Sequence, residues 1–269
     1  MIKQAFIGAD VFDGKRLYQD AALLLSDGAV DAIIDAQSVP DSYAITTMDG
    51  GTILPGFVDL QVNGGGGVMF NDAPSVIGLT TIAEAHARTG TRAFLPTLIT
   101  DTPDRTSAAI DAVATAIAQK VPGILGLHLE GPHLSLAKKG AHDPALIRPM
   151  TANDLAELLD AAKRLPNLMV TVAPENVTFD QVKHLSEHGV IVSLGHTNCS
   201  YDTAQQAIAA GATCVTHLFN AMSQMDSRAP GLVGAALGTP GVMAGLIADG
   251  IHVHPKTIQV ALSAAISFW

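Results

Sequence analysis

The feature that most constrains the fold is a change of pattern near residue 52. Before it, short alternating runs such as KQAFIGADVFDG and AALLLSDGAV are broken by Asp-Gly turns, which is typical of a meander of β-strands. After it, short apolar runs alternate with helical patterns. The helices are expected at residues 75–89, 104–120, 152–165, 179–188, 201–210 and 255–267. The strands are expected in TILPGFVDL, RAFLPTLI, GILGLHLE, LMVTVAPE, VIVSLGH, TCVTHLFN and MAGLIAD.

This alternation predicts a parallel sheet, because each helix carries the chain back to the start of the next strand. Seven such units indicate a (β/α)₈ barrel of the TIM type. A doubly wound open sheet is the alternative. The first strand–helix turn carries no GxGxxG motif, which argues against a dinucleotide site. The glycine run at 63–67 lacks the P-loop lysine, so a tight turn is the simpler interpretation.

Composition and charge exclude several classes of partner. The formal charge of −10 disfavours nucleic acid and anionic membranes. The two cysteines, Cys199 and Cys214, form no CxxC motif, which suits a reducing cytoplasm. No apolar run reaches the roughly 20 residues of a membrane span. We therefore expect a cytoplasmic protein without a nucleic-acid or membrane partner.

Polar and titratable residues gather at the predicted strand ends. In a barrel of this type the active site lies at the carboxyl ends of the strands. The residues at those ends are Asp59, Gln61, Asn63, Thr97, Glu130, Glu175, His196, His217 and Asp249.

Three of these residues point to a metal. Glu130, His196 and His217 end the third, fifth and sixth strands, and two imidazoles with one carboxylate form a ligand set typical of catalytic zinc. Zn²⁺ or Fe²⁺ suits such ligands better than Mg²⁺ does. The simpler alternative is that each histidine caps its strand by hydrogen bonding. A metal would also offset the cost of burying the Glu130 carboxylate.

Several long motifs carry a family resemblance. They are LPGFVDLQVNGGGGVMFND, GLHLEGPHLSLAKKGAHDPALIRP, SLGHTNCSYDTAQQAIAAGATCVTHLFNAMS and GLIADGIHVHP. In order and spacing they resemble those of the N-acetylglucosamine-6-phosphate deacetylases, a family of the amidohydrolase superfamily. The resemblance covers residues from about 50 to 255. It implies a barrel over 52–269 and the first part of a small β-sandwich domain over 1–51.

The resemblance implies one divalent metal ion, Zn²⁺ or Fe²⁺, held by Glu130, His196 and His217. Many amidohydrolases carry His-x-His on the first strand, where this chain has Gln61 and Asn63, which are expected to bind the substrate. Amides are poor ligands beside imidazole, so a second metal is not expected. The resemblance further implies that a water activated by the metal attacks the acetamide carbonyl.

The resemblance also assigns substrate contacts. Ala141 and His142 match residues near the acetamide, where His142 would help to stabilise the oxyanion as a catalytic residue. Asn220 and Ala221 match a loop that binds the sugar phosphate. Arg228 matches a phosphate-binding arginine that reaches a neighbouring subunit, which implies a homodimer. His252 matches a contact to a sugar hydroxyl.

The last expectation concerns the general base. In the family it is an aspartate at the end of the eighth strand, in a TDA-like motif after the helix expected at 255–267. The chain reaches Trp269 without that motif, so we expect a barrel without its eighth strand, truncated at the C-terminus and impaired in turnover. The primary hypothesis is deacetylation of N-acetylglucosamine 6-phosphate in amino-sugar catabolism. The alternatives are another amidohydrolase, on a cyclic amide or another N-acetyl sugar phosphate, and a non-catalytic remnant that binds sugar phosphate or metal.

Overall fold

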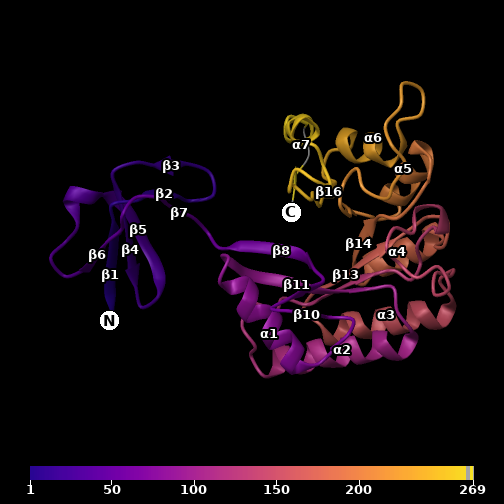
Figure 1. Ribbon diagram of the computed structural model, residues 1–269, viewed down its shortest axis with the longest axis horizontal. Coiled ribbons are helices and arrows are strands. Elements are labelled where there is room, and N and C mark those ends of the chain that lie inside the picture. The colour runs from indigo at the N-terminus through magenta and orange to yellow at the C-terminus, as the bar shows by residue number, and fades with distance from the viewer. Residues whose placement is uncertain (265–266, 269) are drawn as a thin grey trace. The chain divides into compact units, whose positions relative to one another are not determined.

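The chain divides into two compact units, Met1–Phe57 and Val58–Trp269. The structure is a computed structural model that describes residues 1–264 and 267–268 (Figure 1). The division lies slightly after the boundary expected at residues 51 and 52. The reason is that strand β7 (Thr52–Ile53) pairs with β2 (Asp10–Phe12) and so stays with the first unit.

The first unit holds two small sheets, as the meander pattern predicts. One has the order β5-β4-β1-β6, and the other has the order β3-β2-β7. Its remaining strands are β1 (Lys3–Ile7), β3 (Leu17–Tyr18), β4 (Ala21–Ser26), β5 (Ala29–Asp35) and β6 (Ala44–Thr47), with the 3₁₀ helix η1 (Ala36–Ser38). A small core of Ala5, Ala22, Leu24 and Tyr43 lies in this unit. That these sheets are part of a β-sandwich domain stays a prediction.

The second unit is built around an eight-stranded sheet. Its order is β17-β16-β15-β14-β13-β12-β11-β8, and every pairing from β11 to β17 is parallel. The strands are β8 (Phe57–Val62), β11 (Thr91–Ile99), β12 (Leu127–Glu130), β13 (Leu168–Val172), β14 (Ile191–Leu194), β15 (Cys214–Val215), β16 (Met243–Ala244) and β17 (Ser267–Phe268).

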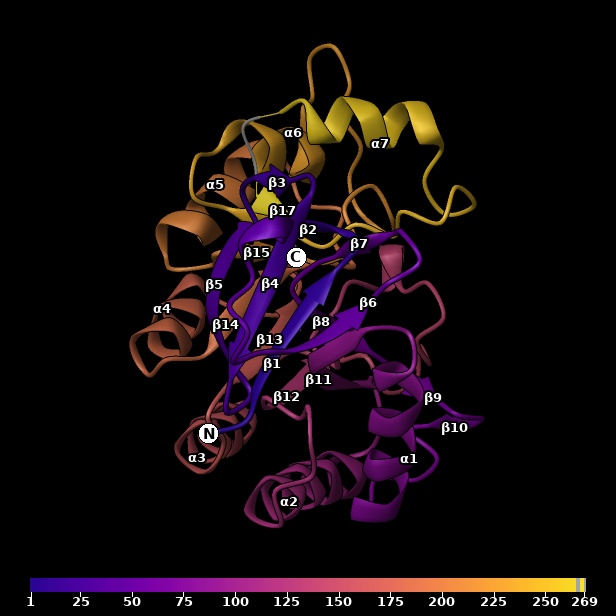
Figure 2. The ribbon, with the colours of Figure 1, turned by 90° about the vertical axis from the view of Figure 1, so that its left-hand side faces the viewer.

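Helices follow one another around the outside of this sheet, as Figure 2 shows for α1 to α5. They are α1 (Val76–Ala87), α2 (Pro103–Ala118), α3 (Ala152–Arg164), α4 (Phe179–Glu187), α5 (Tyr201–Ala209), α6 (Gly231–Gly238) and α7 (Pro255–Leu262), with the 3₁₀ helix η2 (Leu136–Lys138). Their inner faces and the strands share one continuous apolar core. Within the residues described, no helix combines the length and apolar character that crossing a membrane requires.

The TIM-type barrel is confirmed, and the doubly wound alternative is excluded by the strand order. Neighbours in the sheet follow the chain one after another, whereas a doubly wound sheet reverses direction at a switch point. One expectation was wrong. An eighth strand is present as the two residues of β17, which pair in parallel with β16. The expected helix 255–267 ends at Leu262, and its continuation through 265–266 lies outside the described residues.

Local sequence signals explain why these elements begin and turn where they do. Thr151 caps α3 in a reciprocal capping box with Asp154, as the spacing predicts. The glycine run forms a tight hairpin of β9 (Gly64–Gly65) and β10 (Val68–Met69). A Cβ on Gly64 would lie 2.3 Å from the carbonyl oxygen of Val68, so only glycine permits this approach.

Candidate metal centre

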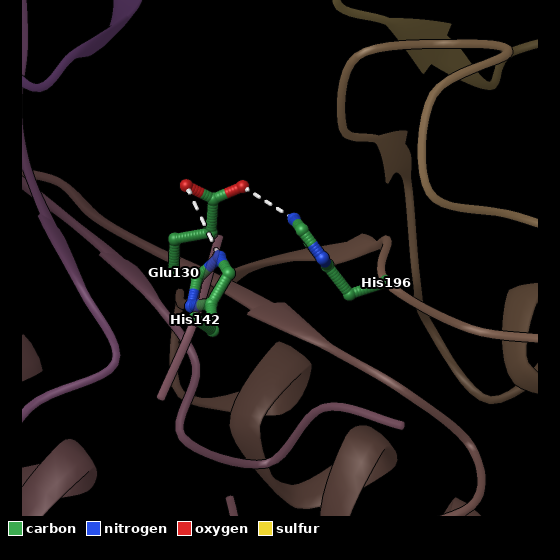
Figure 3. A group of neighbouring side chains, drawn as sticks. All are labelled: Glu130, His142 and His196. Carbon is green, nitrogen blue, oxygen red and sulfur yellow. Dashed lines mark hydrogen bonds and ion pairs between the residues drawn. The ribbon is translucent and has the colours of Figure 1, made fainter. Parts of the chain in front are cut away.

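Three side chains from three separate strand ends meet at the carboxyl rim of the sheet. The Nε2 atoms of His196 and His217 each lie 3.1 Å from Oε1 of Glu130, and 2.9 Å from each other. All three residues are buried, with Glu130 only 3% exposed. Figure 3 shows the Glu130 carboxylate facing His196. The structure therefore brings together the three residues that the sequence predicts as metal ligands.

The opposite ring nitrogens fix how the two histidines are protonated. Nδ1 of His196 lies 2.8 Å from the carbonyl oxygen of Lys138, and Nδ1 of His217 lies 3.1 Å from that of Asn220. A carbonyl only accepts, so each Nδ1 carries the hydrogen and each Nε2 presents a lone pair. Two lone pairs and a carboxylate oxygen then converge on one point.

Such a cluster fits a divalent cation. Ligands of a tetrahedral Zn²⁺ at roughly 2.1 Å lie about 3.4 Å from one another. The observed separations of 2.9 and 3.1 Å are close to this value. The donor set, N₂O with both imidazoles oriented by backbone carbonyls, is one that Zn²⁺ or Fe²⁺ favours.

The charge state of Glu130 agrees with this role. Burial raises the pKa of its carboxyl group, and hydrogen bonds donated by His196 and His217 would outweigh burial and hold the pKa well below its ordinary value. With each Nε2 unprotonated, a bound cation would supply the positive charge that a buried carboxylate needs. A metal site therefore explains why the buried, apolar strand β12 ends on Glu130.

His142 lies beside the cluster but is oriented differently. Its Nδ1 accepts a hydrogen bond from the backbone N–H of Thr100 at 3.2 Å and lies 2.8 Å from the Thr100 hydroxyl. Nε2 therefore carries the hydrogen, and it lies 4.0 Å from Oε2 of Glu130 (Figure 3). Burial lowers the pKa of His142 to about 4, so the ring is neutral at pH 7.

Proximity alone admits a second ligand set. Glu130, His142 and His196 also offer ligand atoms within 4.8 Å of one another. Protonation decides between the two sets. A nitrogen that bears hydrogen donates a hydrogen bond and cannot ligate, whereas His217 presents its lone pair. His217 is the better third ligand, and His142 is a hydrogen-bond donor.

The backbone at both histidines is unusual. His196 and His217 have φ values of +47° and +35°, a region that residues with a Cβ rarely adopt. Each follows the end of a short parallel strand, β14 or β15. Departing from strand geometry at that point turns the imidazole across the rim toward Glu130.

A cavity of about 440 Å³ opens next to His217. Asp59, Gln61 and Asn63 line one side, and residues 245–248 line the other. These three side chains alternate along β8 and its continuation, so they share one face. Gln61 and Asn63, expected to face the substrate, thus border a cavity that reaches the metal cluster.

Arg228 lies elsewhere. It is exposed in the loop before α6 and lines a separate cavity of about 410 Å³ with Tyr201 and Ser223. Asn220 and Ala221 lie in the turn after His217, between that histidine and Arg228 in the chain. Ala221 also has a positive φ of +48°. The structure therefore does not bring Arg228 into the cluster.

His252 and Ala141 are also outside the cluster. Nδ1 of His252 donates to Oδ2 of Asp249 at 2.6 Å, and the His252 side chain is 57% exposed. This bond and two backbone N–H groups lower the pKa of Asp249 to about 2. Ala141 is exposed in the loop that also carries the buried His142.

Sequence reasoning missed the residues that orient the cluster. Thr100 holds His142, and the carbonyl groups of Lys138 and Asn220 hold the two ligand imidazoles. The two carbonyls are backbone groups, and Thr100 also donates through its backbone N–H. Backbone groups are common to every residue type, so no sequence signal could have identified these contacts.

Comparisons with known proteins identify the family of this chain. The Amidohydrolase family matches residues 52–266. The N-acetylgalactosamine-6-phosphate deacetylase of Shewanella sp. (strain ANA-3) is 46% identical over 96% of this chain and 65% of its own length. The N-acetylglucosamine-6-phosphate deacetylase of Haemophilus influenzae is 35% identical, over 96% of this chain and 68% of its own length.

A solved structure is also similar to this chain. The crystal structure of N-acetylglucosamine-6-phosphate deacetylase from Pasteurella multocida superimposes with a TM-score of 0.92 at 38% identity. It covers 98% of this chain, and this chain covers 69% of it. The chain thus spans about two thirds of the length of the relatives that it matches. On this evidence the chain belongs to the amidohydrolase family.

Proposed function

We propose that this chain carries the metal-dependent hydrolysis of the acetamide of N-acetyl-D-glucosamine 6-phosphate, which gives glucosamine 6-phosphate and acetate in amino-sugar catabolism. The observation that carries the proposal is the convergence of Glu130, His196 and His217 with both ligand imidazoles oriented by backbone carbonyls. The deacetylase relatives then indicate which amide is cut.

Glu130, His196 and His217 would hold one divalent ion, Zn²⁺ or Fe²⁺. When bound, such an ion polarises the amide carbonyl and lowers the pKa of a water to about 7. The chain supplies the fixed geometry. The backbone carbonyls of Lys138 and Asn220 keep both imidazoles turned toward Glu130.

His142 acts next to this centre as the catalytic hydrogen-bond donor. Its Nε2–H is aimed into the site and, because the ring is neutral, donates to the developing oxyanion without adding a fixed charge. Gln61 and Asn63 bind the sugar from the opposite wall of the cavity next to His217. Ala141, which precedes His142, contributes backbone contact near the acetamide.

The phosphate is bound farther along the rim. The backbone at Asn220 and Ala221 offers N–H groups, and His252 contacts a sugar hydroxyl. Arg228 is a fork-shaped donor suited to phosphate, and its distance from the cluster supports a role in a neighbouring subunit's site. We propose a homodimer for this reason, and a cytoplasmic location because both cysteines are free.

Proton transfer to the leaving amine is a separate requirement. The family resemblance assigns it to an aspartate that ends an eighth strand. Asp249 is not a substitute, because His252 and two backbone N–H groups occupy its carboxylate and lower its pKa to about 2. We assign the role of general base to none of the described carboxylates.

A second substrate is favoured by one observation. The relative that is 46% identical is named for N-acetylgalactosamine 6-phosphate, the C4 epimer of the glucosamine substrate. Both substrates share the acetamide and the phosphate. They differ only in the hydroxyl that a side chain such as His252 would contact.

The test is acetate release by the purified chain with one equivalent of Zn²⁺ or Fe²⁺. The substrates are both N-acetylhexosamine 6-phosphates, unphosphorylated N-acetylglucosamine and a hydantoin. Acetate from the phosphorylated sugars, abolished by Glu130→Gln, supports the proposal, and the faster epimer identifies the substrate. Hydantoin turnover supports a cyclic-amide hydrolase instead. Calorimetric binding of both sugar phosphates without acetate release supports a non-catalytic binding protein.

A further inference from the structure

Glu175 carries a carboxylate at the rim that the proposed reaction does not use. It follows β13 and lies outside the metal cluster. Yet both of its oxygens are engaged close to a proposed ligand. Oε2 accepts a hydrogen bond from the Thr197 hydroxyl at 2.6 Å, and Oε1 accepts one from the backbone N–H of Asn198 at 2.8 Å.

These two partners directly follow His196. The φ of His196 is +47°, which costs conformational energy unless the surrounding contacts fix it. On the near side, the N–H of Ser135 donates to the His196 carbonyl at 2.9 Å. On the far side, the Glu175 carboxylate holds the next two residues with two charge-assisted hydrogen bonds.

Thr197 extends this support to the second histidine. Its side chain is fully buried, and its hydroxyl also accepts the N–H of Cys199 at 3.0 Å. Its backbone bridges to Met222, and its carbonyl accepts the N–H of Ser223 at 3.0 Å. Met222 closes the turn that follows His217, so Thr197 connects the turns of both ligand histidines.

We propose that Glu175 is a positioning residue for the metal centre, which acts by holding the left-handed turn at His196 through Thr197 and Asn198. Without the carboxylate, the strained residue can relax, and its Nε2 moves away from Glu130. This inference rests on the proposed metal site. It adds a residue that touches neither metal nor substrate but sets the affinity for the metal.

The experiment measures the Zn²⁺ dissociation constant of the full chain by competition with a chromophoric chelator. Glu175→Ala removes both acceptors, and Glu175→Gln keeps one. Thr197→Val removes the hydroxyl at nearly constant shape. The control is Glu187→Gln, an exposed carboxylate of α4 that neighbours Lys183. We expect roughly 10–100-fold weaker binding for Glu175→Ala, a smaller loss for Glu175→Gln and Thr197→Val, and no change for the control.

Two further readouts separate positioning from a merely structural role. The Co²⁺-loaded Glu175→Ala chain should show an altered visible spectrum, because one imidazole has moved. The melting temperature of the metal-free chain reports general destabilisation. Equal Zn²⁺ affinity in all variants, with only the metal-free melting temperature lowered, would overturn the inference. If Glu175→Ala does not fold, Glu175→Gln and Thr197→Val decide by the same criterion.

Failure of the underlying metal site gives a different result. Unsubstituted chain that binds no Zn²⁺, or binds it as tightly after His196→Ala, would refute the site itself and the inference with it. Tight binding that depends on His196 but is indifferent to Glu175 and Thr197 would refute only the positioning role.

Discussion

At the scale of single residues, the protonation of three histidines separates two chemical roles. His196 and His217 donate from Nδ1 to carbonyls and keep a lone pair on Nε2. His142 accepts at Nδ1 from the Thr100 amide and keeps the hydrogen on Nε2. The proposed ligands and the proposed donor are thus distinguished by backbone groups that the fold supplies, although all three are the same residue type.

This distinction predicts the behaviour of His142→Asn. The asparagine carbonyl can still accept from Thr100, so the loop should keep its shape. We expect one equivalent of metal to remain bound, while kcat for acetate release falls by about 10²–10³, the usual cost of one oxyanion donor. Metal content by atomic absorption, measured beside kcat, checks both halves. Loss of metal from His142→Asn with retention in His217→Ala would reverse the two assignments.

Arg228 supports a second prediction at this scale. It lies in a cavity apart from the cluster, so its removal should not change metal content. Arg228→Ala should weaken binding of N-acetylglucosamine 6-phosphate by roughly 10–100-fold, the worth of hydrogen bonds between charged groups. Binding of plain N-acetylglucosamine should be unaffected. Calorimetry with both sugars tests this, and equal losses would mean that Arg228 does not contact phosphate.

At the scale of elements, α3 shows how one side chain fixes a helix start. Asp154 closes the capping box with Thr151 and also accepts a hydrogen bond from Arg148, whose Nη2 lies 2.7 Å from Oδ1. Burial raises the pKa of Asp154, but the hydrogen bonds from Arg148 and Thr151 outweigh burial and hold it well below its ordinary value.

A depressed carboxyl pKa stabilises the fold above the pKa of the unfolded chain. The contribution is lost as the pH falls from about 4 toward the lower folded value. Asp154→Asn should therefore reduce the free energy of unfolding by about 1–2 kcal/mol at pH 7, and by progressively less below pH 4. Urea melts across this range measure it. The matched control is Asp180→Asn, in the first turn of α4. A difference in the free energy of unfolding between Asp154→Asn and the unsubstituted chain that stays constant with pH would contradict this explanation.

The elements that sequence predicts and those that it misses differ in physical terms. Strand–helix alternation predicts α1 to α5 because each begins at a Ser or Thr cap, and α2 to α5 also have a polar face. It misses α6, in GLVGAALG, because three glycines and no polar face give neither helix propensity nor period. Burial of α6 against the core overrides its weak propensity. The two-residue β17 is too short to carry an alternating pattern.

The candidate site divides in the same way. Glu130, His196 and His217 were predictable because they end strands, and strand ends meet at one rim. His142 comes from a loop, and only the family resemblance indicated it. Glu175 was visible as a strand end but had no role until its partners, Thr197 and Asn198, were seen.

At the scale of the whole barrel unit, a layer of buried polar side chains lies just before the metal cluster along the same strands. His128 Nδ1 donates to the Leu60 carbonyl at 3.0 Å and its Nε2 accepts from the Thr171 hydroxyl at 2.7 Å. Thr171 and Ser193 each lie 2.7 Å from the hydroxyl of Thr216. Burial lowers the pKa of His128 to about 4, so this layer carries no charge. Its hydrogen bonds connect five strands across the interior of the sheet. Because the layer is uncharged, the negative charge of the Glu130 carboxylate has to be balanced within the metal cluster itself.

The cluster joins strands that are far apart in the chain. Glu130 is 66 residues from His196 and 87 from His217, and their strands β12, β14 and β15 belong to one sheet. A metal ion that binds only when these ends are together stabilises the folded state in proportion to its occupancy. It would thereby hold together the ends of β12, β14 and β15, with β13 between them in the sheet.

Metal loading should therefore raise the melting temperature of the barrel unit. At a free Zn²⁺ concentration 100 times the dissociation constant, the gain is about 2.7 kcal/mol, which corresponds to roughly 5–10 °C for a unit of this size. Differential scanning calorimetry of the EDTA-treated and Zn²⁺-loaded chain measures it. His196→Ala is the control, and it should melt at the same temperature with and without Zn²⁺. An equal shift in His196→Ala would show that the stabilising ion binds elsewhere, because that variant keeps the fold's other contacts but lacks one imidazole of the cluster.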